Sequence, residues 1–546
     1  MTEQHSPCPR LKQTFVRRRE ESGVAPLGHT TGHYGAVAEG TWVDGAVESA
    51  SGAEKESGAK VSGAVDGGAG RVETTAKSLR VVASAGPSVV LPRPRDLAAT
   101  VDERRALGRQ ARQWAPRRSL SAWNVADRGQ DALATITDQD VLRQPDLVPL
   151  RHARMAVSPW KYYRGAAAVM AADLASCPHS GLEVQLCGDA HVLNFGLWAT
   201  PERNLHFDLR DFDETLPGPF EWDVARLAAS LVVAGRQSAL KPARSEGAVR
   251  AAVESYRKAM HHYARSLELD IWYQRTRVDR FVDSFDHPDR GQMEVHIEER
   301  KGKRTSRGDF SKLATTTHGR PRIATAPPLR VRLPDDEREQ IIDVLLGGYR
   351  LTLQEDRRVL FDRFIEVDTV RQAIGVGSVG TLVYLVLLEG RSGADPLFLQ
   401  YKQACPSVYE PYLGPSRHAN SGERVVAGKR LVQGTTDIFV GWSSLAGRDF
   451  SVRQFRDMKI IPSTDLIAPR LVQFARACGS ALARAHARSG DPVPIDAYIG
   501  KGQAFADAVV SFALRYADQN ERDHAQLVAA IAAGEVDAAT EGAAGS

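Results

Sequence analysis

Hydrophobic residues recur at two spacings along the chain, and these spacings predict two kinds of structure. Between about 150 and 285, apolar residues such as Val224 and Leu227 lie three or four positions apart, which is typical of helices with one buried face. Between about 365 and 460, short runs such as TLVYLVLL and PLFLQYKQA are separated by Gly, Ser and Asp turns, which is typical of an antiparallel sheet. A helical pattern returns from Arg470 to Ala487. The sequence therefore predicts an α+β protein in which a helical part precedes the sheet.

The two ends of the chain lack this hydrophobic patterning. From Gly35 to Gly70 the residues are mainly Gly, Ala, Ser and Glu. Such a stretch cannot bury enough apolar surface to offset the entropy that ordering costs. We therefore expect residues 1–95 to form a disordered arm and the Ala-rich residues 528–546 to form a flexible tail.

The composition indicates one or two large packed cores and gives no sign of a membrane protein. Of the 546 residues, 42% are hydrophobic and 25% are charged, and 71 Lys and Arg against 67 Asp and Glu leave a formal charge of only +4. This small excess does not indicate a polyanionic partner. The five cysteines are scattered, and the longest apolar run is about half a membrane span. We therefore expect a soluble, cytoplasmic protein with reduced cysteines and no membrane partner.

One internal stretch is strongly basic. Arg300 to Arg332 contains ten Lys and Arg residues and a single acid, Asp309. Such stretches are usually solvated loops, and Phe310 is the only aromatic residue here that could stack on a base. We predict a basic loop or insert and do not expect nucleic acid as a partner.

The segment LCGDAHVLNFGLWATPERNLHFDLRDFDE, residues 186–214, has a pattern suited to phosphoryl transfer. Asp189 is followed five positions later by Asn194, and a strand-like run separates this pair from Asp211 and Asp213. Phosphoryl transfer needs a carboxylate that orients or deprotonates the acceptor hydroxyl, and an amide and a second carboxylate that hold Mg²⁺ on the phosphates. We predict Asp189 as the catalytic carboxylate, and Asn194, Asp211 and Asp213 as metal ligands.

Several of these residues have simpler explanations. Asp189 and Asn194 are also common turn residues. His191, which lies in the same loop, either takes part in catalysis or is a buried histidine bonded to backbone. Asp213 either supports the metal site or ends a strand in solvent. We count His191 with Asp189 among the catalytic candidates.

Zinc is a weaker interpretation of the same region. Cys177-x-His179 and Cys187-x3-His191 depart from the usual spacings of zinc ligands, and Cys187 falls in an apolar strand. We therefore do not predict a zinc site.

A second group of residues is suited to binding phosphates. IGVGSVGT carries Gly375, Gly377 and Gly380 in G-x-G-x-x-G spacing, and a β-like run follows it where a dinucleotide-binding unit would need a helix. A further predicted strand contains Lys402. Glycines let the backbone approach phosphates closely, and an ammonium group holds their oxygens. We predict that the glycines and Lys402 bind ATP and that Glu423 fixes the lysine by an ion pair, although an exposed strand lysine is the simpler alternative.

The order of these motifs is unusual. In protein kinases the glycine loop and the lysine precede the catalytic loop, whereas here they follow it by nearly two hundred residues. Asp491 in HARSGDPVPID would restore the usual order, but no Asn stands five residues after it and no D-F-x motif follows. We therefore infer a circularly permuted arrangement.

Several motifs resemble those of known families. CGDAHVLN and the following DFD are similar to the H-G-D-x-H-x-x-N and D-F-x motifs of aminoglycoside phosphotransferases and, more loosely, to the catalytic loop and D-F-G of protein kinases. Together with YYRGAAAVMAADLA, GVGSVGT, QYKQA and VRQFRDMK, they resemble the bacterial domain-of-unknown-function family numbered 2252, over roughly residues 100 to 515. The resemblance implies a kinase-like fold but no particular substrate, and the arginine of the kinase H-R-D motif is absent here.

Two further residues have roles that the sequence leaves open. The resemblance implies that Asp223, which opens the helical run WDVARLAASL, supports the catalytic loop, whereas by position alone it suits the helix dipole. Arg164, in YYRG, either binds an acidic group or makes a structural ion pair.

The sequence thus predicts a two-lobe, protein-kinase-like α+β fold in circularly permuted order. After the disordered arm, the expected segments are a helical lobe with the catalytic loop at 96–285, a basic insert and connecting helix at 286–364, an antiparallel β lobe with the glycine loop at 365–460, C-terminal helices at 461–527 and the tail.

The predicted function is ATP- and Mg²⁺-dependent phosphoryl transfer to an acceptor that the sequence does not identify. Nucleotidyl transfer, with ATP bound the other way round, would use the same residues. Two alternatives stay open: a catalytically silent nucleotide-binding module, and a hydrolase that uses a metal on Asp189, His191, Asp211 and Asp213 without ATP. The oligomeric state is not predicted.

Overall fold

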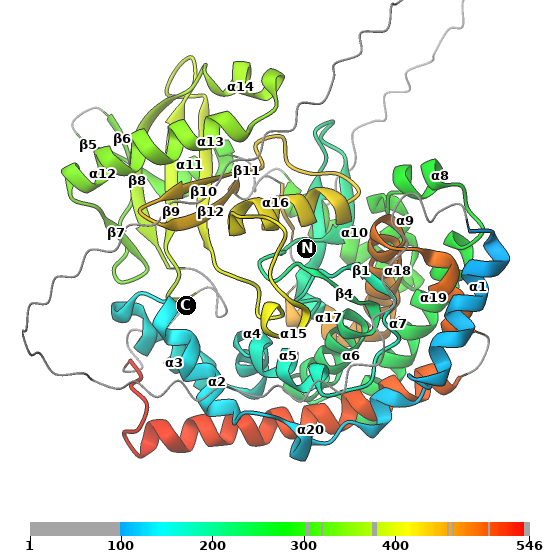
Figure 1. Cartoon of the computed structure of the whole chain (residues 1–546). Helices are drawn as coiled ribbons and strands as arrows, with labels where there is room; N and C mark the ends of the chain where they lie inside the picture. The colour runs from blue at the N-terminus through cyan, green and yellow to red at the C-terminus, as the bar shows by residue number, and fades with distance from the viewer. Residues whose placement is uncertain are drawn as a thin grey trace, which may run out of the picture. The chain divides into compact units, whose positions relative to one another are not determined.

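Figure 1 shows the computed structural model of the chain, which describes residues 99–301, 306–317, 320–373, 379–455, 458–460, 463–500 and 503–539. The predicted disordered arm, residues 1–95, lies outside the described residues, as do Gly375 and Gly377 of the predicted glycine loop. The protein has a mixed α+β fold, as predicted. Its described elements form a helical part with two small antiparallel strand pairs, a six-stranded sheet and a further two-stranded sheet.

The helical part is built from both halves of the chain. Its N-terminal helices are α1 (Val101–Gln110), α2 (Ala132–Asp138), α3 (Val148–Ala156), α4 (Pro159–Gly165), α5 (Ala167–Ala175), α6 (Phe220–Gln237), α7 (Pro242–Tyr263), α8 (Glu268–Tyr273) and α9 (Val278–Asp283). Its C-terminal helices are α17 (Thr464–Ile467), α18 (Leu471–Ser489), α19 (Pro492–Ile499) and α20 (Ala504–Ala532). Because α1 packs against α19, and α20 packs against α6 and α7, both halves share one unit.

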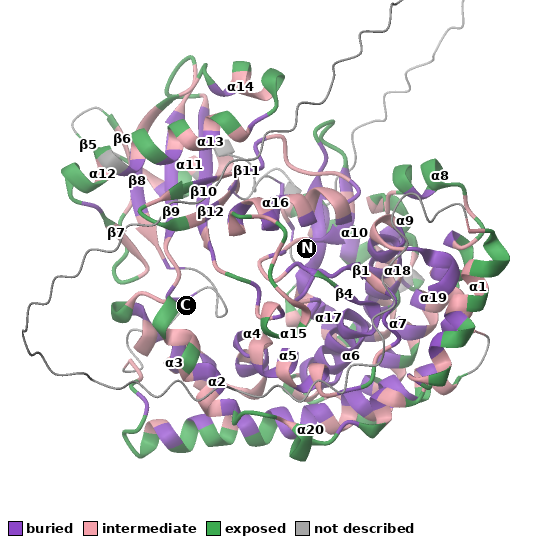
Figure 2. Cartoon of the chain, in the orientation of Figure 1, coloured by how far each residue is buried: buried purple, intermediate pink, exposed green. Residues whose placement is uncertain are grey.

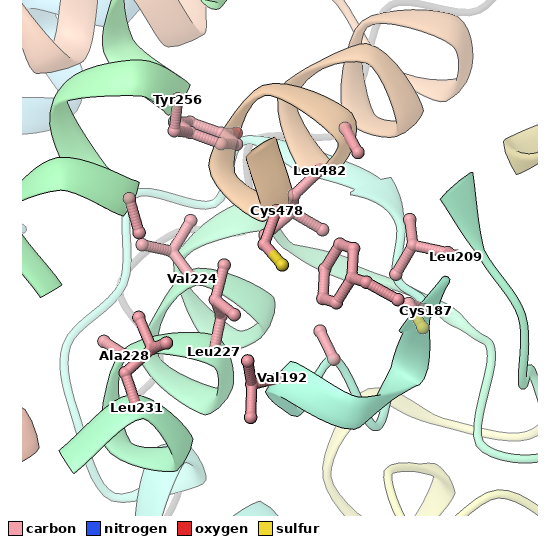
Figure 3. Packing of buried hydrophobic residues seen from close by; sticks show 14 of the residues in the cluster. Cys187, Val192, Leu209, Val224, Leu227, Ala228, Leu231, Tyr256, Cys478 and Leu482 are labelled. Atoms are coloured by element: carbon pink, nitrogen blue, oxygen red, sulfur yellow. The ribbon is translucent and has the colours of Figure 1, made fainter. Parts of the chain in front are cut away.

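Helix α6 lies at the centre of this unit. Its sequence FEWDVARLAASLVVAG is small or apolar around most of the helix, and almost every residue in it is buried, as the purple ribbon in Figure 2 shows. Figure 3 shows Val224 and Leu227 of α6 packed near Cys478 and Leu482 of α18, with Tyr256 of α7 beside them. The first turn of α6 is therefore a fixed support for the loops next to it.

Two antiparallel strand pairs carry the predicted catalytic segment. Strand β1 (Glu183–Gln185) pairs with β4 (Pro217–Pro219), and β2 (Phe195–Ala199) pairs with β3 (Leu205–Leu209). The loop with Asp189 joins β1 to β2, and the loop with the D-F-D motif joins β3 to β4. Because both pairs are antiparallel, the two loops lie at the same end of the strand pairs.

The six-stranded sheet is antiparallel, with the strand order β11-β12-β10-β9-β8-β7. Its strands are β7 (Arg330–Arg332), β8 (Ile365–Gln372), β9 (Val383–Glu389), β10 (Pro396–Ala404), β11 (Gly441–Leu445) and β12 (Arg448–Gln454). The helices that accompany it are α12 (Asp335–Ile341), α13 (Gly347–Thr352), α14 (Glu355–Phe361), α15 (Glu410–Leu413) and α16 (Ser421–Val432).

The alternation of side chains along β10 sets which residues face the helical part. Leu399 and Tyr401 belong to the cluster that includes Tyr349 of α13 and Phe361 of α14. Successive strand residues point to opposite faces of a sheet, so Lys402 lies on the other face from these two. Lys402 is only 7% exposed, which rules out the alternative of an exposed strand lysine.

The prediction of a basic loop at residues 300–332 is wrong for the described residues of this segment. They form the end of α10 (His287–Lys301), then α11 (Ser306–Leu313), the hairpin of β5 (Ala314–Thr317) and β6 (Arg320–Ile323), and β7, which joins the sheet. Asp368 of β8, which is fully buried, accepts hydrogen bonds from Arg322 at 3.1 Å and Arg332 at 2.9 Å. This carboxylate balances two of the basic charges and fastens the segment to the sheet.

The C-terminal boundary also differs from the prediction. Helix α20 continues to Ala532, so residues 528–532 belong to a helix and not to the predicted tail. Its buried residues include Leu527 and Ala530, and this apolar face explains the extension. Among the described residues, no helix is long and apolar enough to cross a membrane.

Candidate active site

The loop that carries Asp189 starts at Gly188, where only glycine fits. Its φ of 86° lies in the left-handed region, and a Cβ would lie 2.3 Å from the carbonyl oxygen of Glu214. The Tyr409 hydroxyl donates to the Gly188 carbonyl at 2.6 Å. This close approach sets the loop with Asp189 directly against the segment that follows the D-F-D motif.

Asp223, in the first turn of α6, holds the loop through hydrogen bonds to its backbone. Its carboxylate accepts hydrogen bonds from the backbone N–H groups of Cys187 at 2.7 Å and Gly188 at 3.0 Å. His486 of α18 lies 3.2 Å from the same carboxylate and 2.8 Å from the Tyr256 hydroxyl. The role that the family resemblance implied for Asp223 therefore agrees with its contacts.

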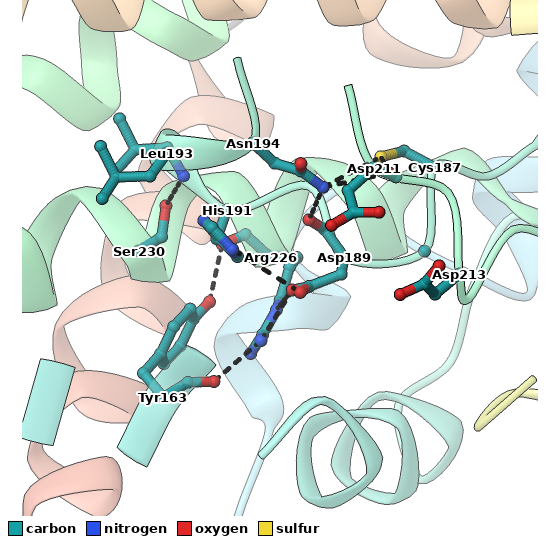
Figure 4. Close-up of polar contacts among 12 residues, drawn as sticks. Tyr163, Cys187, Asp189, His191, Leu193, Asn194, Asp211, Asp213, Arg226 and Ser230 are labelled. Carbon is teal, nitrogen blue, oxygen red and sulfur yellow. Dashed lines mark hydrogen bonds and ion pairs between the residues drawn. The ribbon is translucent and has the colours of Figure 1, made fainter. Parts of the chain in front are cut away.

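Asp189 is an oriented carboxylate, as Figure 4 shows. Arg226 of α6 donates to it through Nε at 2.8 Å, and His191 Nε2 lies 3.6 Å away. Arg226 is itself fixed, since it donates to the Tyr163 carbonyl at 2.9 Å and lies 4.0 Å over the Tyr163 ring. Although burial raises the pKa of Asp189, the charge of Arg226 and the hydrogen bond that it donates outweigh burial and hold that pKa below its usual range. Asp189 is therefore ionised at neutral pH.

His191 is a neutral side chain that packs beside Asp189. Burial lowers its pKa to about 3. Its ring meets Trp160 edge to face, with the centroids 6.0 Å apart, and its Nδ1 has no hydrogen-bond partner among the described residues. Of the two interpretations of this histidine, the contacts favour a buried residue. It packs against Asp189 and is not bonded to backbone.

Asn194 ties the two loops together. Its amide nitrogen donates to the carbonyl of Asp189 at 2.7 Å and to that of Asp211 at 3.1 Å. This assigns the orientation of the amide, because only NH₂ can donate to two carbonyls. Asn194 is 1% exposed, and its Oδ1 has no hydrogen-bond partner among the described residues. A buried acceptor without a donor is a free ligand position for a cation.

Lys402 meets the D-F-D motif although about 190 residues separate them in the chain. Its Nζ lies 3.7 Å from Asp211 Oδ1 and forms a shorter ion pair with Asp213. Burial acts to lower the pKa of Lys402, but the charges of Asp211 and Asp213 raise it above its usual value. The lysine is therefore charged, and the juxtaposition that the permuted arrangement requires is present.

The two carboxylates beside Lys402 differ in acidity. Burial acts to raise the pKa of Asp211, but Lys402, Arg453 and Arg210 outweigh burial and hold that pKa well below its usual range. For Asp213, burial and the neighbouring charge of Asp211 together raise the pKa. Asp211 is thus the more acidic member of the pair and the stronger candidate for a metal ligand.

These groups line one cavity of about 170 Å³ between the sheet and the helical part. Asp189, His191, Asp211, Asp213 and Lys402 all contribute to its wall. Polar atoms make up most of the wall, so the cavity suits a charged ligand better than an apolar one.

Arginine residues that the sequence analysis did not single out also line this cavity. They are Arg143, Arg210 and Arg453. Arg210 donates to the Leu193 carbonyl at 2.9 Å, and Arg453 donates to Gln400 on the neighbouring strand at 2.9 and 3.0 Å. A signal existed for both, because Arg210 adjoins the D-F-D motif and Arg453 lies in VRQFRDMK.

Arg424 of α16 was also missed. It is 2% exposed and donates to three backbone carbonyls, those of Thr215 at 2.6 Å, Asp213 at 2.7 Å and Cys405 at 2.8 Å. It therefore joins the D-F-D segment to the end of the strand that carries Lys402.

Two predicted binding residues have different surroundings from those expected. Glu423 pairs with His418 at 3.4 Å, and the carboxylates that pair with Lys402 are those of Asp211 and Asp213, so the predicted Lys402–Glu423 ion pair is wrong. Gly380 has a φ of 93°, and a Cβ there would lie 2.9 Å from the Arg143 side chain, so this glycine sits against a residue that lines the cavity.

The rival base Asp491 has a structural role. Its carboxylate accepts a hydrogen bond from the Val493 N–H at 2.9 Å, which caps α19, and pairs with Arg104 of α1 at 3.1 Å. In the part of the chain that the structure describes, no group of three or more His, Cys, Asp or Glu residues is arranged to hold a metal ion. The candidate ligands for a metal ion in the cavity are therefore two carboxylates and one amide oxygen.

Comparison with known proteins gives one match. Residues 143–530 match the model of a family described as "Uncharacterized protein conserved in bacteria (DUF2252)". No curated protein and no solved structure matches the chain.

Proposed function

The chain belongs to the DUF2252 family of uncharacterised bacterial proteins, and from the geometry of its cavity we propose that it is an ATP- and Mg²⁺-dependent phosphotransferase. One observation carries the proposal. A charged lysine from the sheet and the Asp189 and Asp211 side chains from the helical part line one cavity, and Asn194 donates hydrogen bonds to the backbone carbonyls of both aspartates. Phosphoryl transfer needs this combination, because it depends on positioning and on neutralising charge.

In this proposal the loop with Asp189 acts on the acceptor hydroxyl, and the D-F-D motif acts on the phosphates of ATP through the metal ion. Asp189, ionised and oriented by Arg226, would accept the hydrogen of the acceptor hydroxyl and align its oxygen. Its lowered pKa makes it a weak base, which suits a loose transition state in which the hydroxyl loses its proton late.

The residues present fit a magnesium ion that arrives with the phosphates. Asn194 Oδ1 and the carboxylates of Asp211 and Asp213 would hold it, since Mg²⁺ commonly binds one or two carboxylates together with substrate phosphates. When bound, the ion would neutralise negative charge on the phosphate oxygens. Lys402 and Arg453 from the sheet, and Arg210 from the loop after β3, would bind the remaining phosphate oxygens.

The arrangement corresponds to that of a protein kinase with the chain order permuted. A sheet lysine, an Asp-x4-Asn loop and a D-F-x motif occur in both, but here the lysine follows the other two. The ion pair of Lys402 differs as well, since its partners are Asp211 and Asp213 and not a helix glutamate. We propose that bound phosphates replace these carboxylates as partners of the lysine.

A metal-dependent hydrolase without ATP explains less of the cavity. It would use Asp189, His191, Asp211 and Asp213, but it gives no role to the buried Lys402 or to the arginines around it.

The proposal is tested with the full chain, Mg-ATP and water as the basal acceptor. Mg-ATP at a hundredfold excess over its dissociation constant should stabilise the wild-type protein by about 2.7 kcal/mol against unfolding. Asp189→Asn should keep this stabilisation and lose phosphate release by roughly a hundredfold or more, because a carboxylate base contributes that much. Lys402→Met should lose the stabilisation itself.

Lys258→Met provides the matched control, because this α7 lysine is 69% exposed. It should leave both nucleotide stabilisation and phosphate release unchanged. Full turnover by Asp189→Asn, or no stabilisation of the wild type by Mg-ATP, would overturn the proposal. ATP labelled at the α-phosphate also distinguishes the two chemistries, since label transferred to protein would indicate nucleotidyl transfer.

A further inference from the structure

We propose that the acceptor of this phosphotransferase carries an anionic group, a phosphate or a carboxylate, which binds to Arg164 beside Asp189. This inference rests on the proposed function and specifies its substrate class. It starts from the charges that line the cavity, namely those of Arg143, Arg164, Arg210, Lys402 and Arg453 against those of Asp189, Asp211, Asp213 and Glu214.

Most of the carboxylates that line the cavity already form ion pairs with basic side chains of the protein. Asp189 pairs with Arg226, which does not itself line the cavity, while Asp211 and Asp213 pair with Lys402. Within the described part of the chain, no carboxylate forms an ion pair with Arg164, Arg210 or Arg453. The cavity therefore presents guanidinium groups that need anions from a ligand.

These guanidinium groups divide between two sides of the cavity. Arg210 and Arg453 act on the charge of Asp211, and so belong with the nucleotide phosphates. Arg164 lies in the last turn of α4, and the nearby Gly165 and Ala167 line the cavity with it. Asp189 is the carboxylate whose charge acts most on Arg164. Since the acceptor hydroxyl must approach Asp189, Arg164 lies where the rest of the acceptor would bind.

Arg164 is preorganised to bind an anion. Its guanidinium lies 6.0 Å from the centroid of the Trp160 ring, and the same ring meets His191 edge to face. Its Nε is buried and has no hydrogen-bond partner among the described residues. An arginine that lines a cavity and lies beside an aromatic ring can offer the parallel hydrogen bonds of its guanidinium to a phosphate or carboxylate.

The N-terminus of helix α5 also favours an anion at this position. It begins at Ala167, which lines the cavity, and runs for nine residues. Its N-cap residue is Ala166, and no side chain caps its first amide groups. The positive end of this helix therefore reinforces the charge of Arg164 for an anion bound between them.

The test is a calorimetric titration of the full chain in two steps. The protein is first saturated with Mg²⁺ and a non-hydrolysable ATP analogue, and inorganic phosphate or acetate is then added. We expect saturable binding of at least one anion beside the nucleotide, and at least tenfold weaker binding in Arg164→Gln. Arg164→Lys keeps the positive charge but not the planar guanidinium group. Its affinity for the anion should therefore lie between those of the wild type and Arg164→Gln. Arg250→Gln on α7, 45% exposed, is the matched control and should bind the anion like the wild type.

The two steps separate this inference from the proposed function. If the ATP analogue does not bind in the first step, the proposed function is overturned. If the analogue binds but neither anion does, or if both Arg164 variants bind the anion as tightly as the wild type, the acceptor site at Arg164 is refuted. If phosphate binds more tightly than acetate, the acceptor carries a phosphate group. If acetate binds more tightly, the acceptor carries a carboxylate.

Discussion

Asp211 and Asp213 show how one lysine can set two neighbouring carboxylates apart. Both lie beside Lys402, yet the pKa of Asp211 is lowered while burial and the charge of Asp211 raise that of Asp213. Two carboxylates at one cation cannot both keep a full charge at low cost, so one takes most of the ionisation. Asp211 would therefore be the first ligand of a metal ion, and the charge of that ion would lower the pKa of Asp213.

Glu221, in the first turn of α6, gives a prediction about stability and pH. It is 3% exposed and accepts a hydrogen bond from the Ser180 N–H at 2.8 Å, while its other oxygen has no partner among the described residues. Burial raises its pKa to about 7, from 4.5 in an unfolded chain. Between these values the folded state binds more protons than the unfolded state, so stability falls as the pH rises from 4.5 to 7.

Glu221→Gln should remove this contribution. The pKa difference corresponds to roughly 3 kcal/mol of unfolding free energy, so the wild type should lose up to that amount, relative to the variant, between pH 4.5 and pH 7. Urea unfolding of both proteins across this range measures the difference. Parallel loss of stability in the two proteins would show that Glu221 ionises normally in the folded state.

Single residues of the site could be predicted only where their chemistry lies in a local motif. Asp189, Asn194 and Asp211 were predicted because their spacing along the chain is itself informative, and Lys402 because a glycine-rich turn precedes its strand. Arg226 and Arg424 contact the site from distant elements, so nothing near them in sequence indicates what they contact. The partner of Lys402 was predicted wrongly for the same reason, since α16 presents both Glu423 and Arg424 and only packing decides which is buried.

At the scale of elements, α16 connects the sheet to the D-F-D segment through Arg424. The three carbonyls that Arg424 satisfies belong to the D-F-D segment and to the residue just after β10. Arg424→Met should leave them without a donor and destabilise the protein by about 3 kcal/mol or more, since each unsatisfied buried group costs about 1–3 kcal/mol. Thermal or urea unfolding measures the loss, and nucleotide stabilisation should fall with it.

Glu423→Gln, on the same helix, tests the predicted ion pair of Glu423 with Lys402 separately from the structural role of Arg424. Glu423 pairs with His418 and is 36% exposed, so the variant should change stability by less than about 1 kcal/mol. If Glu423→Gln weakened nucleotide binding as much as Arg424→Met, Glu423 would be part of the lysine site after all.

The sheet was easier to predict than the elements at its edge. Runs such as PLFLQYKQA and TLVYLVLL have the length and β-branched or aromatic content of buried strands, and they form β10 and β9. Strand β7 has three residues and is Arg-Val-Arg, and no pattern that short predicts a strand. It joins the sheet because the buried Asp368 provides a partner for Arg332, a contact 36 residues away in the chain.

At the scale of the whole described chain, the helical part depends on contacts between its N-terminal and C-terminal segments. Arg128, between η4 (Val125–Asp127) and α2, donates two hydrogen bonds of 2.7 Å to Asp173 of α5 and two of 3.0 and 3.1 Å to Asp523 of α20. All three side chains are at most 7% exposed. Because α5 starts at the proposed acceptor site, Arg128 links that site to the last helix of the protein.

Arg128→Met should therefore destabilise more than its own segment. It removes one cation and leaves two buried carboxylates without their partner, which typically costs about 3–5 kcal/mol. Amide hydrogen exchange in α20 should accelerate together with exchange in α5, because both helices lose the same contact. Arg250→Met is the control, since its pair with Asp507 of α20 is about half exposed and should contribute less than about 1 kcal/mol. Faster exchange confined to the residues around position 128 would mean that α20 is held by its apolar face alone, and that the two segments are not coupled through this arginine.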